Sequence, residues 1–381
     1  MIQRPIRQLL AERLKAFPAV ALFGSRQTGK TTLARTFSQA YYDLELEEER
    51  LKLDIQWAEL IKAKKLIILD EAQNYPGIFP RIRSAIDAAR SLKGRFLLLG
   101  SVSPALMKEV SESLAGRIVL CELAPLSLQE LETKRDDMLW LRGGYPEGGI
   151  LKAKNFPVWQ SSYLELLAMR DLPVWGLPAQ PPAILRFFRM VAANHGNVWN
   201  ASQTGKSLGV SYHTANVYLT YLEQAYLTRR VQPYHANIRK RLAKSPKVYW
   251  RDSGLLHSLL RIHTIEELLV QPWVGMSWEG WVIEQILISL NNRGVQYDGP
   301  YYLRTNDGYE IDLILGLSGI TYAIEVKLTS SPGKGDAERL QKAADMIGAA
   351  KRILISKTTE HIESRSFVST NPRRFLEYLQ K

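Results

Sequence analysis

The stretch VALFGSRQTGKTT, residues 20–32, decides the fold expected for the first part of the chain. Its apolar beginning, residues 20–24, predicts a buried strand, and a helix is expected from Lys30 onward. Between them, GSRQTGKT at 24–31 matches the glycine-rich pattern that cradles phosphates, in the strand–loop–helix setting that the pattern requires. The sequence therefore predicts a phosphate-binding loop.

Each residue type in this loop has a physical reason. Gly24 and Gly29 let the backbone bend, so that its N–H groups and the helix N-terminus face the phosphates. We expect Lys30 to reach the β and γ phosphates of ATP and the hydroxyl of Thr31 to bind Mg²⁺. The expected nucleotide-binding residues are Gly24, Ser25, Arg26, Gln27, Thr28, Gly29, Lys30, Thr31 and Thr32.

A second tetrapeptide, TGKS at 204–207, resembles the end of this loop. Asn200 stands where the pattern needs its first glycine, and no apolar strand precedes it. We interpret this tetrapeptide as a decoy.

The strand LIILDEAQ, residues 66–73, ends in the adjacent carboxylates Asp70 and Glu71. Ligands of open α/β sheets bind at the carboxyl edge, where these acids should lie. We expect Asp70 to hold magnesium through water and Glu71 to polarise the attacking water as the catalytic base. The plainer alternative is a strand that ends in two solvated acids, which would leave the phosphate loop without its partner.

The first part of the chain alternates predicted strands and helices, and two more candidate site residues lie beside these strands. Apolar runs at 20–24, 66–70, 96–101 and 118–123, separated by helical segments, indicate an α/β fold with a parallel sheet covered on both faces. Ser101, at a strand end, is expected to orient the water or sense the γ phosphate. Arg117, just before the last strand, could enter a neighbour's site as an arginine finger, or be an ordinary exposed arginine.

The composition fits a multidomain globular protein. The 381 residues are 46% hydrophobic and 23% charged, and 50 Lys and Arg against 38 Asp and Glu give a net charge of +12, which suits a polyanion such as DNA. Cys121 is the single cysteine, so no internal disulfide can form. With neither a signal peptide nor an apolar run of roughly 20 residues, we expect a cytoplasmic protein without membrane association.

Several motifs together resemble a family of prokaryotic AAA+ ATPases whose members end in a domain of unknown function. They are the phosphate loop, DEAQ at 70–73, GSVS at 100–103, SLAGR at 113–117 followed by LAPLSLQEL, and GGYPE at 143–147. The resemblance implies an AAA+ fold and ATPase activity, with ATP and Mg²⁺ as cofactors. A finger acting in trans would require self-association, for which a ring or hexamer would serve. The expected domains are an ATPase core at 1–125, a helical lid or connector at 126–180, and further domains at 181–261 and 262–381.

Residues 185–234 read as a helix, a short helix, a turn at Gly209, a second helix from about Ser211 and a strand. This order resembles a winged helix-turn-helix. We expect an outward, DNA-facing surface made by Tyr212, His213, Thr214 and Asn216, and an inward one made by Val217, Leu219 and Leu222. Basic residues suited to phosphate contacts follow: Arg229, Arg230, Arg239, Lys240, Arg241, Lys244 and Lys247. The alternative is a winged helix that serves only as a docking domain.

The last region carries a pattern of acids and a lysine. Glu325 and Lys327 are two apart in the strand YAIEVKL, so both project from one face. With Asp312 in the strand YEIDLIL, they resemble the core of the PD-(D/E)XK nucleases, including archaeal Holliday-junction resolvases. The resemblance implies that Asp312 and Glu325 bind magnesium or manganese, that Lys327 activates the water, and that Glu279, or else Glu284, completes the site. Ile311 stands where these nucleases often have proline, and the alternative is a degenerate fold that binds without cutting.

Two functions remain open at this point. The first is an ATP-driven DNA-processing machine that acts on branched or recombining DNA. The second is a signalling or defence ATPase that uses its nucleotide state as a switch, with C-terminal domains that bind a protein partner.

Overall fold

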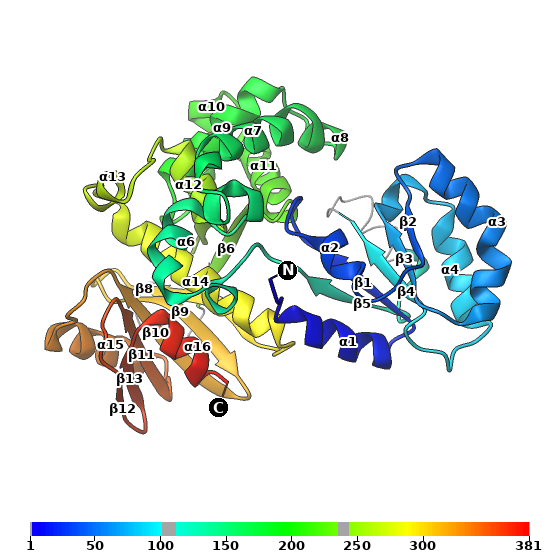
Figure 1. Cartoon of the computed structure of the whole chain (residues 1–381). Coiled ribbons are helices and arrows are strands. Elements are labelled where there is room, and N and C mark those ends of the chain that lie inside the picture. Colours follow the sequence, from blue (N-terminus) through cyan, green and yellow to red (C-terminus); the bar gives the residue numbers. More distant parts are fainter. Residues whose placement is uncertain (1, 101–111, 235–243, 381) are drawn as a thin grey trace. The chain divides into compact units, whose positions relative to one another are not determined.

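The computed structural model describes residues 2–100, 112–234 and 244–380, and these form two compact units (Figure 1). The first unit runs to Leu126 and includes Gln224–Tyr226 and Asn291–Gly294. The second consists of Ser127–Glu223, Leu227–Leu290 and the residues from Val295 onward. Among the described helices, none has both the length and the apolar character needed to cross a bilayer.

The first unit is a parallel sheet of five strands in the order β2-β3-β4-β1-β5. Its strands are β1 (Ala19–Phe23), β2 (Tyr41–Asp43), β3 (Ile67–Asp70), β4 (Phe96–Leu99) and β5 (Ile118–Glu122). Its helices are α1 (Ile6–Ala16), α2 (Lys30–Ala34), α3 (Glu47–Ala63) and α4 (Ile78–Asp87). The expected α/β fold with a parallel sheet is confirmed, and β2 is an additional edge strand that the sequence analysis missed.

Alternating side chains of β1 explain why both faces of this sheet are covered. Ala21 and Phe23 pack into a core with residues of α3 and α4, such as Ile82. Val20 and Leu22 pack into a second core with α1 and α2. Because every residue of β1 is buried, the strand reads as a continuous apolar run.

The second unit contains a mixed sheet of eight strands in the order β12-β13-β11-β10-β9-β8-β6-β7. Its strands are β6 (Thr228–Pro233), β7 (Lys247–Trp250), β8 (Asp298–Arg304), β9 (Glu310–Leu317), β10 (Ile320–Lys327), β11 (Lys351–Ser356), β12 (Ile362–Glu363) and β13 (Phe367–Thr370). Its helices are α6 (Asp136–Arg142), α7 (Val158–Leu166), α8 (Leu172–Val174), α9 (Pro181–Ala193), α10 (Ala201–Leu208), α11 (Tyr212–Gln224), α12 (Ser253–Leu259), α13 (Ile265–Leu269), α14 (Val274–Asn292), α15 (Lys334–Met346) and α16 (Pro372–Tyr378).

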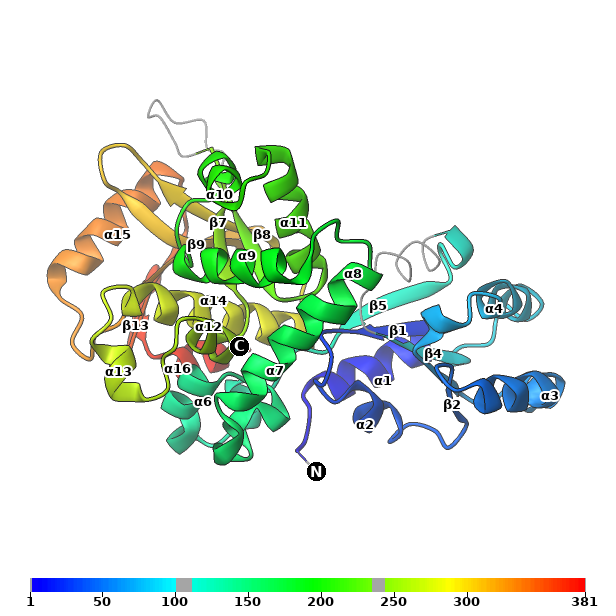
Figure 2. The same ribbon diagram turned by 90° about the horizontal axis from the view of Figure 1, so that it is seen from above.

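Strand β6 joins two parts of this unit. It pairs antiparallel with β7, through Thr228 opposite Trp250, and parallel with β8, through Gln232 opposite Tyr301. Helices α9, α10 and α11 lie together beside this pair (Figure 2). Apart from Leu126, Gln224–Tyr226 and Asn291–Gly294, the described residues of the regions predicted at 126–180, 181–261 and 262–381 fall in one compact unit that contains a continuous sheet.

Helix α11 buries Ala215, Tyr218, Leu219 and Leu222. These positions follow the helical spacing of three and four residues, which places them on one side. The expectation that Val217 faces inward is wrong, because its side chain is 45% exposed. Val217 is apolar, but its phase in the helix places it away from the buried side.

Candidate nucleotide site and acidic pocket

The phosphate loop follows β1 and has the backbone bends that its glycines allow. Gly24 has φ of 149° and Gly29 has φ of 93°, values that favour glycine. A Cβ atom at Gly24 would lie 2.2 Å from the carbonyl oxygen of Leu123, so no larger residue fits there.

Lys30 begins α2 and points back over this loop. Its Nζ donates to the carbonyl oxygens of Gly24 at 3.0 Å and Ser25 at 2.8 Å. Burial lowers the pKa of Lys30 to about 8. The ammonium is therefore held inside the loop, beside the position where phosphates would bind.

Asp70 lies at the end of β3 and meets the phosphate loop. The hydroxyl of Thr31 donates to Asp70 Oδ2 at 2.6 Å, and the backbone N–H of Glu71 donates to Asp70 Oδ1 at 3.0 Å. The hydroxyl of Tyr41, on β2, donates to the same Oδ2 at 2.8 Å. The structure thus brings together Thr31 and Asp70, and it adds Tyr41, for which no motif gave a signal.

Glu71 occupies a strained position next to this pair. It has φ of 49°, which is uncommon for a residue with a side chain, and its carboxylate accepts a hydrogen bond from the amide of Gln73. Burial raises the pKa of Glu71 above its ordinary value. A buried carboxylate at the carboxyl edge of the sheet is suited to accept a proton from water.

The loop has one further support that the sequence analysis missed. Arg4 Nη1 donates to the carbonyl oxygen of Thr28 at 2.8 Å, and Nη2 donates to that of Ala124 at 2.6 Å. The guanidinium therefore ties the loop to the segment after β5. The predicted nucleotide-binding residues from Gly24 to Thr32 all belong to this one loop and helix start. Ser101 lies outside the described residues.

Arg117 lies immediately before β5, which runs parallel to β1. It is therefore at the edge of the sheet opposite the phosphate loop, away from the site of its own chain. Its Nε and Nη2 form a two-point contact with Asp87, at 3.0 and 2.9 Å. The expected role as an arginine finger for a neighbour stays a prediction.

We expect Arg117→Ala to slow ATP hydrolysis of the self-associated protein by roughly ten- to hundredfold, with ATP affinity nearly unchanged. This is less than the ~10³-fold effect of strong arginine fingers, since Arg117 must first leave Asp87. Steady-state turnover and nucleotide binding would be measured in parallel. Arg90→Ala is the matched control, because Arg90 also contacts Asp87, at 3.2 Å, but is 76% exposed. A loss of ATP binding in Arg117→Ala would contradict a role in trans.

The residues predicted to face DNA differ in their surroundings. Tyr212 and His213 are exposed and their rings lie 4.0 Å apart. The backbone N–H of Thr214 donates to Ser211 Oγ at 3.1 Å, which begins the helix. Asn216 Oδ1 accepts from Trp199 Nε1 at 2.8 Å. Of the four residues, Tyr212 and His213 are therefore the ones whose side chains are exposed to solvent.

The expected phosphate contacts of the β6 arginines do not fit the structure. Arg229 makes a two-point ion pair with Glu284, at 2.7 and 3.0 Å, and this carboxylate also binds Arg251. Arg230 contacts Glu223 at 3.2 Å. Both arginines stabilise the fold, because their side chains turn toward neighbouring helices. Lys244 is exposed, and Arg239, Lys240 and Arg241 lie outside the described residues.

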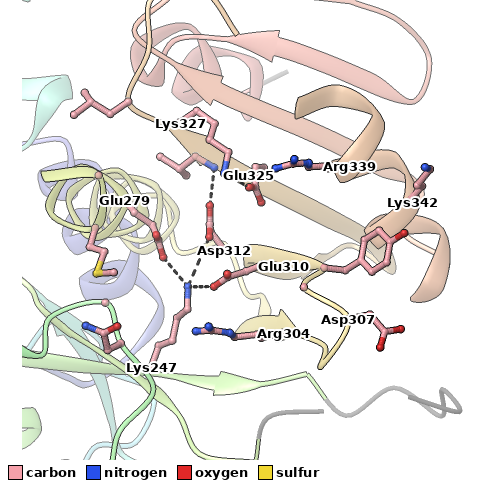
Figure 3. A pocket seen from close by; sticks show the side chains of 18 of the residues that line it. Lys247, Glu279, Arg304, Asp307, Glu310, Asp312, Glu325, Lys327, Arg339 and Lys342 are labelled. Carbon is pink, nitrogen blue, oxygen red and sulfur yellow. Dashed lines mark hydrogen bonds and ion pairs between the residues drawn. The ribbon is translucent and has the colours of Figure 1, made fainter. Parts of the chain in front are cut away.

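A pocket of about 910 Å³ gathers the acids predicted from the nuclease resemblance (Figure 3). Glu279 comes from α14, Asp312 from β9, and Glu325 and Lys327 from β10. Lys327 Nζ lies 2.5 Å from Glu325 Oε1, and the backbone N–H of Val326 donates to Asp312 Oδ2 at 2.9 Å. Exposed basic side chains of Arg304, Arg339 and Lys342 also line the pocket.

Charge and burial shape the acids of this pocket. Burial, and then the neighbouring carboxylates Glu279 and Glu325, hold the pKa of Asp312 well above its ordinary value. Burial also raises the pKa of Glu325. Glu284, the alternative fourth ligand, lies elsewhere, where Arg229 and Arg251 outweigh its burial and lower its pKa to about 2.

Lys247, predicted to contact phosphate, instead lies inside this pocket. Its Nζ is 3.0 Å from Glu279 Oε1, 2.7 Å from Glu310 Oε1 and 3.7 Å from Asp312 Oδ1 (Figure 3). Within the described ranges, no group of three or more His, Cys, Asp or Glu side chains is arranged to hold a metal ion. With the ammonium in this place, the predicted ligands do not fit a divalent cation.

Comparison with known families divides the chain into three parts. Residues 16–132 match an AAA domain, residues 134–266 a domain of unknown function (DUF8612), and residues 274–372 a domain of unknown function (DUF4143). Two curated relatives, the uncharacterized proteins Rv2008c of Mycobacterium tuberculosis and Mb2031c of Mycobacterium bovis, are each 38% identical over 328 residues. These alignments cover 85% of this chain and 73% of each relative.

Solved structures give weaker likenesses. RuvB T158V of Thermotoga maritima is 18% identical with a TM-score of 0.30, and the alignment covers 60% of this chain and 90% of that one. AMPPCP-bound DnaA from Aquifex aeolicus is 14% identical with a TM-score of 0.28, covering 57% and 86%. Likenesses at these TM-scores carry no argument for this chain. From the curated relatives and the matched domain, the chain belongs to the family of the two mycobacterial proteins and begins with an AAA-type P-loop ATPase domain.

Proposed function

We propose that the protein hydrolyses ATP with Mg²⁺ and uses this activity on DNA. The observation that carries the ATPase part is the meeting of Thr31 and Asp70, 2.6 Å apart, beside the buried Lys30. A hydroxyl and a carboxylate are hard oxygen donors of the kind that Mg²⁺ binds together with nucleotide phosphates. The residues present therefore fit the cofactor.

The side chains of this site divide the work of hydrolysis. Lys30 would exchange its contacts with the loop carbonyls for phosphate oxygens. Thr31 would bind the cation directly and Asp70 would hold it through water. Bound there, Mg²⁺ would neutralise charge that develops on the phosphates. Glu71 orients the attacking water and takes its proton, and Tyr41 keeps Asp70 in place through its hydroxyl.

The DNA part of the proposal rests on the second unit. Three helices followed by the antiparallel pair β6–β7 have the order of a winged helix-turn-helix, and Tyr212 and His213 are exposed at the start of α11. The net charge of +12 favours a polyanionic partner. The resemblance of the acidic pocket to junction resolvases favours branched DNA, although the pocket offers no fitting metal site for cleavage.

The second candidate is an ATPase switch that binds a protein partner. The ion pairs of Arg229 with Glu284 and of Arg230 with Glu223 favour this second candidate. They engage two cations that were expected to contact DNA phosphates. ATP hydrolysis should be measured alone and with single-stranded, duplex and four-way-junction DNA, while the DNA is scored for cleavage. Stimulation by one DNA form would support the first candidate; slow turnover that ignores all three would support the second.

A change in the basic segment between β6 and β7 in the sequence tests the proposed DNA contacts directly. We expect the Lys240→Ala/Arg241→Ala protein to bind duplex DNA more weakly and to lose about one unit of salt slope per lost phosphate contact. The slope would be taken from affinities measured over a range of salt concentrations. Lys62→Ala/Lys65→Ala, which removes two exposed lysines of the first unit, is the matched control. An unaltered slope in the Lys240→Ala/Arg241→Ala protein would argue for a docking role.

A further inference from the structure

Lys247 is a cation enclosed by acids. Its side chain is 3% exposed, and Glu279, Glu310 and Asp312 lie within 3.7 Å of Nζ. Exposed lysines make few fixed contacts, since their long side chains keep conformational freedom. Lys247 differs from such lysines, because three carboxylates hold its buried ammonium in one position (Figure 3).

The backbone fixes where this ammonium lies. Lys247 begins β7, where it pairs with Val231 of β6 and forms an isolated bridge with Val198. Its Nζ also lies 5.5 Å from the ring centre of Tyr302 on β8. The pairing of β7 in the sheet therefore fixes where the Lys247 ammonium lies, in contrast to the ammonium of a surface lysine, which can adopt many rotamers.

The oxygen atoms around Lys247 are the ones that a divalent cation would need. Glu279 Oε1 is shared by Lys247 and by the hydroxyl of Tyr249. Glu325 Oε2 is buried without a hydrogen-bond partner among the residues that the structure describes. A hard cation needs several such oxygens at close range, and an ammonium already placed among them repels it.

We propose that Lys247 is the resident cation of this pocket, a fixed ammonium in place of a divalent metal ion, so that Mg²⁺ and Mn²⁺ are kept out of the pocket in the folded protein. Two acids of the nuclease-like pattern, Glu279 and Asp312, then hold a lysine of strand β7. This inference is independent of ATP hydrolysis and of DNA binding.

The test is Mn²⁺ binding to the full chain, measured without nucleotide by the loss of the free-Mn²⁺ electron paramagnetic resonance signal. An Asp70→Asn background removes the carboxylate proposed to hold Mg²⁺ in the nucleotide site. We expect no Mn²⁺ bound by the pocket in this background up to about 1 mM. Adding Lys247→Met should create one site that binds at least about tenfold more tightly, because one positive charge has left the acids.

Controls separate this effect from general loss of charge. Lys334→Met removes an exposed lysine of α15, which lies 3.6 Å from Glu338, and should gain no Mn²⁺ site. Glu325→Gln, added to Lys247→Met, should weaken the new site. Circular dichroism would verify folding of each variant.

Removal of one partner from a buried ion cluster can unfold a protein. If Lys247→Met does not fold, Lys247→Gln/Glu310→Gln leaves less unpaired charge and should still bind Mn²⁺ better than the background. The proposal is overturned if a folded Lys247 variant binds no Mn²⁺. It is also overturned if the Asp70→Asn protein already binds one Mn²⁺ ion and loses this binding when Glu325→Gln is added. This second comparison does not require any substitution of Lys247.

Discussion

Replacement of Lys30 by alanine is expected to lower ATP turnover by about 10³-fold and to weaken ATP binding. The reason is that the ammonium is buried in the phosphate loop, where a charge close to phosphate oxygens acts with little screening by water. Its present contacts with the carbonyls of Gly24 and Ser25 keep it there. Phosphate release and binding of a fluorescent ATP analogue would measure the two effects.

The chain offers a matched control for this change. Lys206 belongs to the tetrapeptide TGKS at 204–207, which resembles the end of the phosphate loop, but it is an exposed residue within helix α10. Lys206→Ala should therefore leave ATP turnover unchanged. Normal turnover in Lys30→Ala, or an equal loss in Lys206→Ala, would contradict the assignment of the nucleotide site.

Glu71→Gln is expected to bind ATP and to hydrolyse it about 10²–10³-fold more slowly. The amide keeps the shape of the side chain but cannot accept the proton of water, which is the contribution of a general base. Single-turnover hydrolysis after saturation with ATP would isolate this step. Glu48→Gln, at an exposed position of α3, should turn over ATP normally, and unchanged hydrolysis in Glu71→Gln would reassign the base.

The pH profile gives a second measure of Glu71. A base acts only when it is deprotonated, so activity falls as the pH drops through its pKa. Because burial raises the pKa of Glu71 above its ordinary value, the acid limb should lie at a higher pH than an exposed glutamate would give. This limb should disappear from the residual activity of Glu71→Gln.

The nucleotide site could be predicted from sequence because its signals are local. The loop from Gly24 to Thr31 carries its glycines, lysine and hydroxyl within eight positions, and Asp70 and Glu71 end an apolar strand. Their meeting follows from the rule that parallel strands present their carboxyl ends at one edge. Arg4 and Tyr41 belong to no such pattern, and only the folded chain shows them at the loop.

The basic residues of the second unit were harder to predict. In the sequence, Arg229 and Lys247 come after the predicted helix-turn-helix, which favours their use as DNA contacts. Their partners in the fold are distant in sequence: Glu284 is 55 residues after Arg229, and Glu279 is 32 residues after Lys247. Which face of a strand such residues occupy depends on the sheet that forms around it. A surplus of positive charge in sequence therefore does not tell an exposed cation from a buried counter-ion.

Strand β6 has a consequence for cutting the protein into pieces. Sequence families place a border between residues 266 and 274, yet β6 hydrogen-bonds to β8 across that border. A fragment that began at residue 262 would uncover this edge of β8, and bare strand edges promote pairing between molecules and precipitation. It would also leave Glu279, Glu310 and Asp312 without their lysine. The two stretches of unknown function are therefore best expressed as a single polypeptide.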